Sequence, residues 1–250
     1  MAAAPRIRYA RTTRDWHGDY LRRVQEFIVT SGARRVCELG AGANPALPHE
    51  FVEERELEYV VTDADPVELQ KAPAGYEQFQ VDLCARDFEP PGVFDLAFSA
   101  SVAEHIAEPS LFHRNVGRLL DDGGRAMHLF STLYALPFVL NRLLPEKLGD
   151  VIVQRLYRFR AAEGMHAKFP AYYRWCRGPT RAQLERLEGA GFRVDEYVGL
   201  FGHFYYDSVP LIQRVEDRAA DWLVDHPAPW LTSYAFVVLT KQADPALGHS

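Results

Sequence analysis

The chain alternates short apolar runs with segments whose apolar residues recur every three or four positions. Short runs of this kind are typical of buried strands, and the longer segments are typical of amphipathic helices. Strands are predicted over residues 35–39, 59–62, 77–81, 94–98, 125–130, 192–200 and 234–240. Because strands and helices alternate, we expect an α/β fold with a mostly parallel sheet.

Helices are predicted before and between these strands. Tyr20, Val24 and Ile28 recur at helical spacing, and Gly32 follows as a terminator. The next helix should begin near Leu47, because Pro45 and Pro48 fit only a first turn. Further helices are predicted over residues 109–120, 180–190 and 209–222, the last with its apolar residues on one face, and residues 121–124 are predicted to form a turn.

Composition and charge narrow the class of protein. The chain has 250 residues, of which 48% are hydrophobic and 25% are charged, and it is long enough for one domain with a sizeable core. A net charge of -6 argues against a dedicated nucleic-acid binder. Cys37, Cys84 and Cys176 form no CxxC pair, so neither a disulfide framework nor a zinc site is expected. With no apolar run near the roughly 20 residues of a membrane span and no signal peptide, we expect a cytoplasmic protein without a membrane contact.

The central chemical signal is Glu38-Leu39-Gly40-Ala41-Gly42, which ends the strand predicted at residues 35–39. Glycines there allow a tight turn and a close approach of the backbone to a ligand. Asp63 and Asp82 stand at the tips of the next two strands, where carboxylates line the binding edge of a parallel sheet. The loop lacks the dinucleotide fingerprint, since Pro45 occupies the third glycine position. A ligand with one compact charged group is therefore favoured over a pyrophosphate.

At this point the sequence resembles the class I S-adenosylmethionine-dependent methyltransferases. The resemblance is carried by residues 36–44, by Asp63, by Asp82-Leu83, by residues 94–106 and by residues 119–125, in order and at family spacing. It implies a Rossmann-like, seven-stranded, mostly parallel sheet with the last strand antiparallel and helices on both faces. Within a single domain, it divides the chain into an N-terminal helix or lid (1–30), a cofactor-binding half (34–130), a helical substrate cap (131–179) and C-terminal helices and strands (180–250).

The resemblance further implies S-adenosyl-L-methionine as the cofactor and S-adenosyl-L-homocysteine as its product. Asp63 corresponds to the ribose-binding acid, and Asp82 with Leu83 to the pair beside the adenine. Asn44 stands where many members have a third glycine, and Asn tolerates left-handed backbone conformations. The cofactor-binding residues implied are Glu38, Gly40, Ala41, Gly42, Asn44, Asp63, Ala64, Asp82, Leu83, Ser99 and Ala100.

His105 follows the strand predicted at residues 94–98, where active sites of this family open. A histidine can take the proton of a hydroxyl or amine nucleophile, so His105 is the candidate general base. The alternative interpretation is a structural histidine whose ring bonds to the backbone of its own helix. Glu104 beside it is interpreted as structural, and no metal ligands are expected.

Substrate selection is expected in the segment 131–179, whose aromatic and basic side chains suit a ring, a sugar face or an anionic group. The alternative is a helical cap whose aromatics only pack on the sheet. His203 is added because it follows a glycine in an aromatic stretch, and Trp16 with Arg14 is considered as a lid over the cofactor. The substrate-binding candidates are Tyr134, His166, Tyr172, Tyr173, Trp175, Arg177 and His203.

The expected reaction is methyl transfer to an oxygen or nitrogen nucleophile of a small or medium-sized molecule, such as a sugar or natural product, by direct in-line displacement. The alternatives left open are an RNA or protein methyltransferase and a non-catalytic S-adenosylmethionine-binding scaffold. The oligomeric state does not follow from the sequence.

Overall fold

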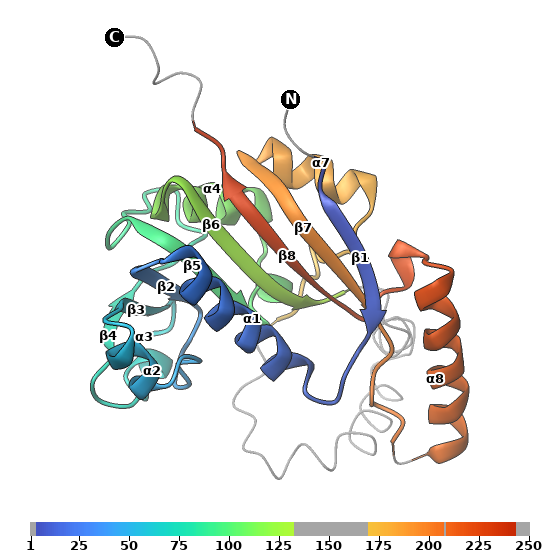
Figure 1. Ribbon diagram of the computed structural model, residues 1–250. Helices are drawn as coiled ribbons and strands as arrows, with labels where there is room; N and C mark the ends of the chain where they lie inside the picture. The colour runs from blue at the N-terminus through green and yellow to red at the C-terminus, as the bar shows by residue number, and fades with distance from the viewer. Residues whose placement is uncertain (1–3, 133–169, 208, 244–250) are drawn as a thin grey trace.

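The computed structural model describes residues 4–132, 170–207 and 209–243, which form one mixed sheet with helices on both faces (Figure 1). The strand order is β1-β7-β8-β6-β5-β2-β3-β4. The strands are β1 (Arg6–Arg11), β2 (Arg35–Leu39), β3 (Glu58–Asp63), β4 (Glu77–Gln80), β5 (Phe94–Ala100), β6 (Leu120–Ser131), β7 (Phe192–Phe201) and β8 (Tyr234–Lys241). The helices are α1 (Trp16–Ser31), α2 (His49–Glu54), α3 (Pro66–Leu69), η1 (Ala103–His105), α4 (Pro109–Leu119), α7 (Arg181–Gly189), α8 (Pro210–Asp225) and η3 (Pro229–Leu231).

The directions of the strands determine at which edge of the sheet the connecting loops lie. β8 pairs antiparallel with both β6 and β7, and every other pair in the sheet is parallel. The parallel strands therefore end at one edge, which we call the carboxyl edge. The loops after β2, β3, β4 and β5 all leave the sheet there, which is where α/β sheets bind ligands. The predicted mostly parallel α/β sheet is confirmed.

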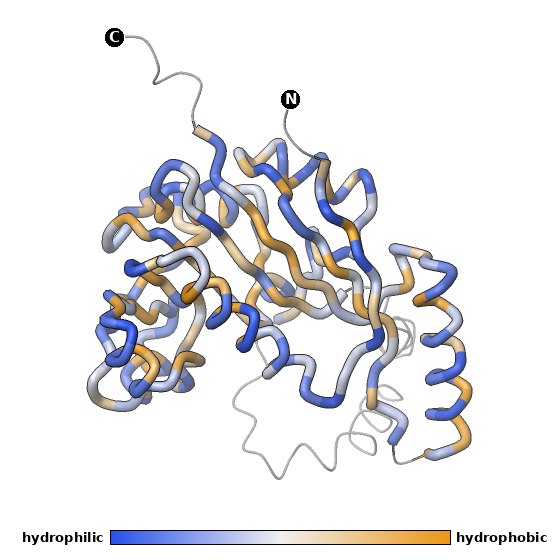
Figure 2. The backbone as a smooth tube through the Cα atoms, in the orientation of Figure 1, coloured by the Kyte–Doolittle hydropathy of each residue, from blue (hydrophilic) through white to orange (hydrophobic). Residues whose placement is uncertain are grey.

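Two cores form because the central strands are apolar on both faces (Figure 2). On one face α1 buries a stripe made by Tyr20, Val24 and Ile28, four residues apart, together with Leu69 of α3. The Tyr20 hydroxyl donates a hydrogen bond of 2.8 Å to the carbonyl of Met127 in β6. Gly32 ends α1 in the left-handed conformation, as predicted.

The opposite face is covered by α4 and α7. Phe112, Val116 and Leu119 form the apolar stripe of α4, and Leu187 of α7 joins the same cluster. At the amino end of the sheet, one carboxylate oxygen of Asp95 accepts the backbone N–H groups of both Arg34 and Arg35 at 2.8 Å. This contact fixes the start of β2 against β5.

The sheet has eight strands because residues 6–11, which were predicted to belong to the N-terminal helix or lid of residues 1–30, form the edge strand β1 beside β7. The prediction of seven strands was wrong on this point. Three arginines are interspersed among Ile7, Tyr9 and Ala10 in this strand. Because β1 is an edge strand, their charged groups can remain solvated. Glu196 of β7 forms ion pairs with Arg8 and with Arg23 of α1, which compensates the charge.

Two further expectations are corrected. Residues 121–124 do not form a separate turn but an irregularity inside β6, where Leu120 pairs with Phe94 and Arg125 already pairs with Leu96. In α8 the predicted apolar face is exposed, with Val215 64% and Trp222 59% accessible. The helix packs on β1 and β7 at the end of the sheet, with Gln213 and Ala220 as its buried residues. No helix in the described part of the chain has the length and apolarity to cross a membrane.

Candidate functional site

The glycine loop after β2 closes on the carboxyl edge. Gly40 and Gly42 both have positive φ angles, +66° and +51°, which favour glycine. A Cβ at Gly40 would lie 2.7 Å from a methyl carbon of Val102, in the loop after β5. The backbone N–H of Ala41 donates to the carbonyl of Thr62 in β3 at 2.9 Å. The loop is therefore fixed between its two neighbouring strands, with no space for side chains at the glycines.

Asp63 meets this loop directly. A Cβ at Gly42 would lie 3.3 Å from the Asp63 carboxylate, and the other carboxylate oxygen accepts the N–H of Asp65 at 2.9 Å. Burial raises the pKa of the half-buried Asp63, and backbone N–H groups, including that of Gly42, oppose the shift. The predicted ribose-binding acid and the glycine loop therefore share one site. Ala64 follows at the exposed strand tip.

Glu38 stabilises the glycine loop from the buried side of the sheet edge. Its side chain is 5% exposed, and one carboxylate oxygen accepts the N–H of Ala46 at 2.8 Å and the hydroxyl of Tyr59. Burial raises the pKa of Glu38 to about 7, although both hydrogen bonds favour the charged form. Tyr59 was not identified from the sequence, because its role depends on the pairing of β2 with β3. The backbone of Asn44, whose N–H donates to Ala41, needs no left-handed conformation, since its φ is not positive.

The loop after β4 is held by a residue that sequence reasoning missed. One Asp82 carboxylate oxygen accepts the N–H of Cys84 at 2.7 Å, so this carboxylate caps a turn. The side-chain amide of Asn115, in α4, donates to the carbonyls of Leu83 and Ala85, both at 2.9 Å. The predicted adenine pair, Asp82 and Leu83, therefore lies in a loop whose shape is set from α4.

The end of β5 corrects one side-chain expectation. Ser99 is fully buried, and its hydroxyl is hydrogen-bonded to Nδ1 of His128 at 2.9 Å. The Ser99 side chain therefore points into the core under α4. Ala100 packs on the opposite face, with the α1 core. Ser101 follows with a φ of +57°, a sparsely populated conformation that recurs at functional sites.

His105 lies in η1, the short helix after β5. Its Nδ1 is 3.1 Å from the carbonyl oxygen of Pro170. A carbonyl only accepts, so Nδ1 carries the hydrogen, and in the neutral form of the ring Nε2 is the nitrogen with the lone pair. The backbone carbonyl of Glu104 accepts the N–H groups of Tyr172 and Tyr173 at 2.8 and 3.0 Å. The segment from Pro170 to Tyr173 is thus fastened to η1.

Glu104 is buried, as its structural interpretation requires. Its Oε1 is 3.5 Å from the N–H of Ser131, and Oε2 has no hydrogen-bond partner among the described residues. Burial raises the pKa of Glu104.

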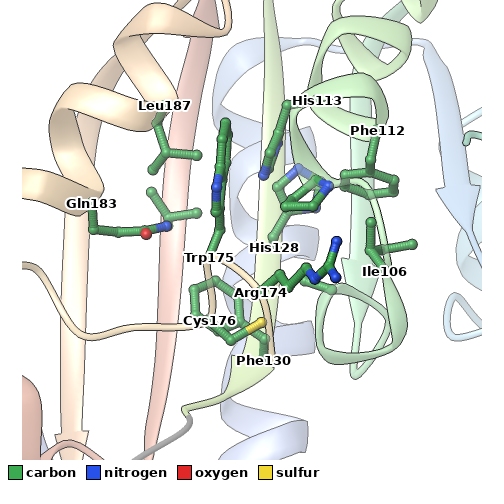
Figure 3. A pocket seen from close by; sticks show the side chains of 13 residues that line it. Ile106, Phe112, His113, His128, Phe130, Arg174, Trp175, Cys176, Gln183 and Leu187 are labelled. Atoms are coloured by element: carbon green, nitrogen blue, oxygen red, sulfur yellow. The ribbon is translucent and has the colours of Figure 1, made fainter. Parts of the chain in front are cut away.

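A small cavity of about 10 Å³, room for about one water, lies under the same segment, between α4, α7 and the sheet (Figure 3). The ring of Trp175 stacks on His113 of α4, with centroids 5.7 Å apart. Burial lowers the pKa of His113, and that of His128 to about 4, so both are neutral at pH 7. Val102 touches Gly40, whereas the next residue, Ala103, lines this cavity. The loop from Val102 to His105 therefore separates the glycine loop from the cavity.

The substrate candidates separate into three groups. Tyr172, Tyr173, Trp175 and Arg177 lie in the segment fastened to η1. Tyr134 and His166 lie outside the described residues, as does most of the segment 131–179. His203 is buried where β7 leads into α8, and its backbone N–H is 3.2 Å from a carboxylate oxygen of Glu216. The His203 Nε2 also lies 3.9 Å from Glu216, so these contacts join α8 to the end of β7, and contact of His203 with a substrate stays a prediction.

The N-terminal run crosses the carboxyl edge between β1 and α1 (Figure 1). Trp16 stacks on Tyr234 at the start of β8, with centroids 4.2 Å apart. Arg14 forms an ion pair with Asp207 at 2.6 Å and lies over the ring of Phe204. These contacts fix the segment considered as a lid against the ends of β7 and β8.

Comparison with known proteins agrees with this geometry. Residues 38–128 match the family model described as a methyltransferase domain. The match begins at Glu38 and includes the glycine loop, Asp63, Asp82 and His105. A search of curated protein sequences finds no match.

Solved structures of the same fold share little sequence with the chain. An S-adenosylmethionine-dependent methyltransferase from Archaeoglobus fulgidus has 15% identity and a TM-score of 0.53, with 92% of this chain and 95% of that chain covered. A phosphoethanolamine N-methyltransferase 2 from Haemonchus contortus, in complex with S-adenosyl-L-methionine, has 15% identity and a TM-score of 0.51, with 88% and 53% covered. The [4+2]-cyclase SpnF has 15% identity and a TM-score of 0.50, with 89% and 82% covered. At this identity the likeness establishes the fold.

Glu38 should make stability depend on pH. Its folded pKa of about 7 lies above the ordinary value, so the unfolded chain loses the proton first as the pH rises. The free energy of unfolding should therefore fall between about pH 4.5 and 7.5, by on the order of 3 kcal/mol relative to Glu38→Gln. Urea unfolding of both proteins at several pH values measures this difference. Glu50→Gln, at an exposed position of α2, is the matched control, and parallel curves for wild type and Glu38→Gln would contradict the assignment.

Proposed function

We propose that the chain is a class I S-adenosylmethionine-dependent methyltransferase and that it methylates an oxygen or nitrogen nucleophile of a small or medium-sized molecule at the carboxyl edge. The observation that carries the proposal is that the Asp63 carboxylate lies against Gly42, whose backbone N–H interacts with it and where a Cβ would come within 3.3 Å of it. A glycine loop beside a half-buried acid suits a ligand that combines a compact charged group with a ribose.

The residues present fit the cofactor. Asp63 would accept the ribose hydroxyls, and Gly40 to Gly42 would leave room for the methionine end. The loop containing Leu83, positioned by Asn115, would hold the adenine. When bound, S-adenosylmethionine supplies a methyl group on a positively charged sulfur, which a nucleophile displaces in line. Positioning of the nucleophile can contribute up to about 11 kcal/mol to such a step.

His105 is proposed as the general base for a protonated nucleophile. Its Nδ1–H is directed to the Pro170 carbonyl, and Nε2 would accept the proton as the new bond to the methyl carbon forms. The same hydrogen bond orients the ring, as second partners of catalytic histidines commonly do. The proposal is supported by Val102, three residues before His105, which lies against Gly40 of the glycine loop.

Loss of Asp63 should weaken cofactor binding. Asp63→Ala and Asp63→Asn are each expected to raise the dissociation constant for S-adenosylhomocysteine at least tenfold, because the ribose loses a charged acceptor. Isothermal titration calorimetry measures the change. Asp65→Asn is the matched control, since it removes a nearby charge and keeps the oxygen that caps Val67. An unchanged affinity in Asp63→Ala would remove the ribose assignment, and absence of any binding by the wild type would favour a scaffold.

Removal of the base should separate catalysis from binding. His105→Ala is expected to lower kcat by 10²- to 10⁴-fold and to leave affinity for S-adenosylhomocysteine within about twofold. His105→Asn retains a donor for the Pro170 carbonyl but no base, so it should be equally slow with unchanged thermal stability. Full turnover in either variant would exclude His105 as the base. The assay follows S-adenosylhomocysteine formation with a panel of hydroxyl and amine compounds, and turnover of RNA or protein alone would favour the alternative acceptors.

A further inference from the structure

A surface groove of about 490 Å³ lies between the start of α4 and α7. The segment of residues 174–177 forms one wall, and Arg186 of α7 lines the groove as well. Its charged lining consists of Arg174, Arg177 and Arg186 against the single carboxylate of Glu108. Three guanidinium groups around one groove are unusual on a chain whose net charge is -6.

Two of these arginines, Arg174 and Arg186, lack the ion pair that many surface arginines of the described residues form. Within the described residues, no carboxylate lies in ion-pair distance of Arg174 or Arg186, whereas Arg181 on the same helix as Arg186 pairs with Glu185 at 2.8 Å. The Arg174 guanidinium donates instead to the carbonyl of Ala107 at 2.7 Å. A backbone carbonyl fixes the direction of a guanidinium but leaves its charge and its remaining donors for an anion.

The wall that carries two of the arginines is rigidly placed. Trp175 stacks on His113 (Figure 3) and has a φ of +59°, a conformation that bulky residues adopt only when their surroundings impose it. The guanidinium of Arg177 donates to the carbonyls of Tyr173 and Cys176 at 2.8 and 2.9 Å. Such preorganisation reduces the entropy lost when an anion is bound.

The groove adjoins the candidate base. Ala107, which holds Arg174, comes two residues after His105, and Pro170, which holds His105, comes four residues before Arg174. The same two segments therefore carry the candidate base and two of the three guanidinium groups, those of Arg174 and Arg177. The N-terminus of α4 also lies at the groove, and its N-cap residue Glu108 makes no side-chain capping bond, which adds to the attraction of an anion there.

We propose that this groove binds a phosphate or carboxylate group of the methyl acceptor and so restricts the enzyme to anionic acceptors. This inference rests on the proposed methyl transfer. Arg186 is the specificity-determining residue that sequence reasoning missed, because only the packing of α7 beside residues 174–177 brings it to the groove. Phosphate and carboxylate share the required chemistry, since both accept two parallel hydrogen bonds from a guanidinium.

Anion binding can be measured without knowledge of the acceptor. Phenyl phosphate, benzoate and inorganic phosphate are titrated calorimetrically into the full-length protein. We expect saturable binding of at least one of the two organic anions, weakened at least fivefold in Arg186→Gln. Arg181→Gln, the same charge change on the same helix, should change the affinity less than twofold. Glu108→Gln should tighten binding by two- to fivefold, because it removes the opposing charge. No saturable binding, or equal weakening by Arg181→Gln, would overturn the proposal.

The link to the acceptor is tested by turnover of matched pairs of hydroxyl and amine compounds, each with and without a phosphate or carboxylate. The anionic member should be preferred at least tenfold in kcat/KM, and Arg186→Gln should abolish the preference mainly through KM. Equal turnover of both members, or binding of an RNA oligonucleotide without binding of phenyl phosphate, would contradict the inference. Affinity for S-adenosylhomocysteine, measured in the same variants, reports separately on the proposed function, since the groove does not include the glycine loop.

Discussion

Parallel pairing of β2 with β3 and β5 is the constraint on which the site depends. In register, Leu39 pairs with Thr62, and Glu38 with Phe98. The three strands therefore end side by side, and the chain must leave each of them at the same edge. Strand pairing therefore brings residues that are 20 to 60 positions apart together at this edge. The position of the Asp63 carboxylate against Gly42, where a Cβ would come within 3.3 Å of it, is a direct consequence.

The buried carboxyl group of Glu38, which fixes the glycine loop, has a cost in free energy. A carboxyl group taken out of water is costly unless hydrogen bonds compensate, and here the Ala46 N–H and the Tyr59 hydroxyl do so. Burial nevertheless raises the pKa of Glu38 to about 7, so the compensation is incomplete. The acid beside the glycine loop serves mainly to fix the loop to the sheet from its buried side.

The loop after β5 connects the glycine loop, where the cofactor is proposed to bind, with the segment proposed to bind the methyl acceptor. Val102 packs on Gly40, Ala103 lines the internal cavity, Glu104 binds the segment at Tyr172 through its carbonyl, and His105 bonds to Pro170. These four consecutive residues together contact the glycine loop and the segment of residues 170–173, which leads into the wall of the arginine groove. A shift of residues 170–177 relative to η1 would therefore change the position of the candidate base and the shape of the anion groove at the same time.

The sequence by itself determined the parallel α/β fold, the glycine loop, Asp63 at a strand tip and the resemblance to a methyltransferase domain over residues 38–128, because each depends on a local pattern of a few residues. It did not predict β1, because the arginines of this edge strand obscure the apolar pattern, and the charge of Arg8 is balanced by an ion pair with Glu196. Nor did it predict where the side chains of Ser99 and His203 and the apolar face of α8 lie. It also missed Asn115 and Arg186. Those placements depend on pairs of residues that are distant in the chain, such as Ser99 with His128 and His203 with Glu216. Local hydrophobic period specifies which face of an element is buried, but only tertiary packing decides which neighbour that face meets.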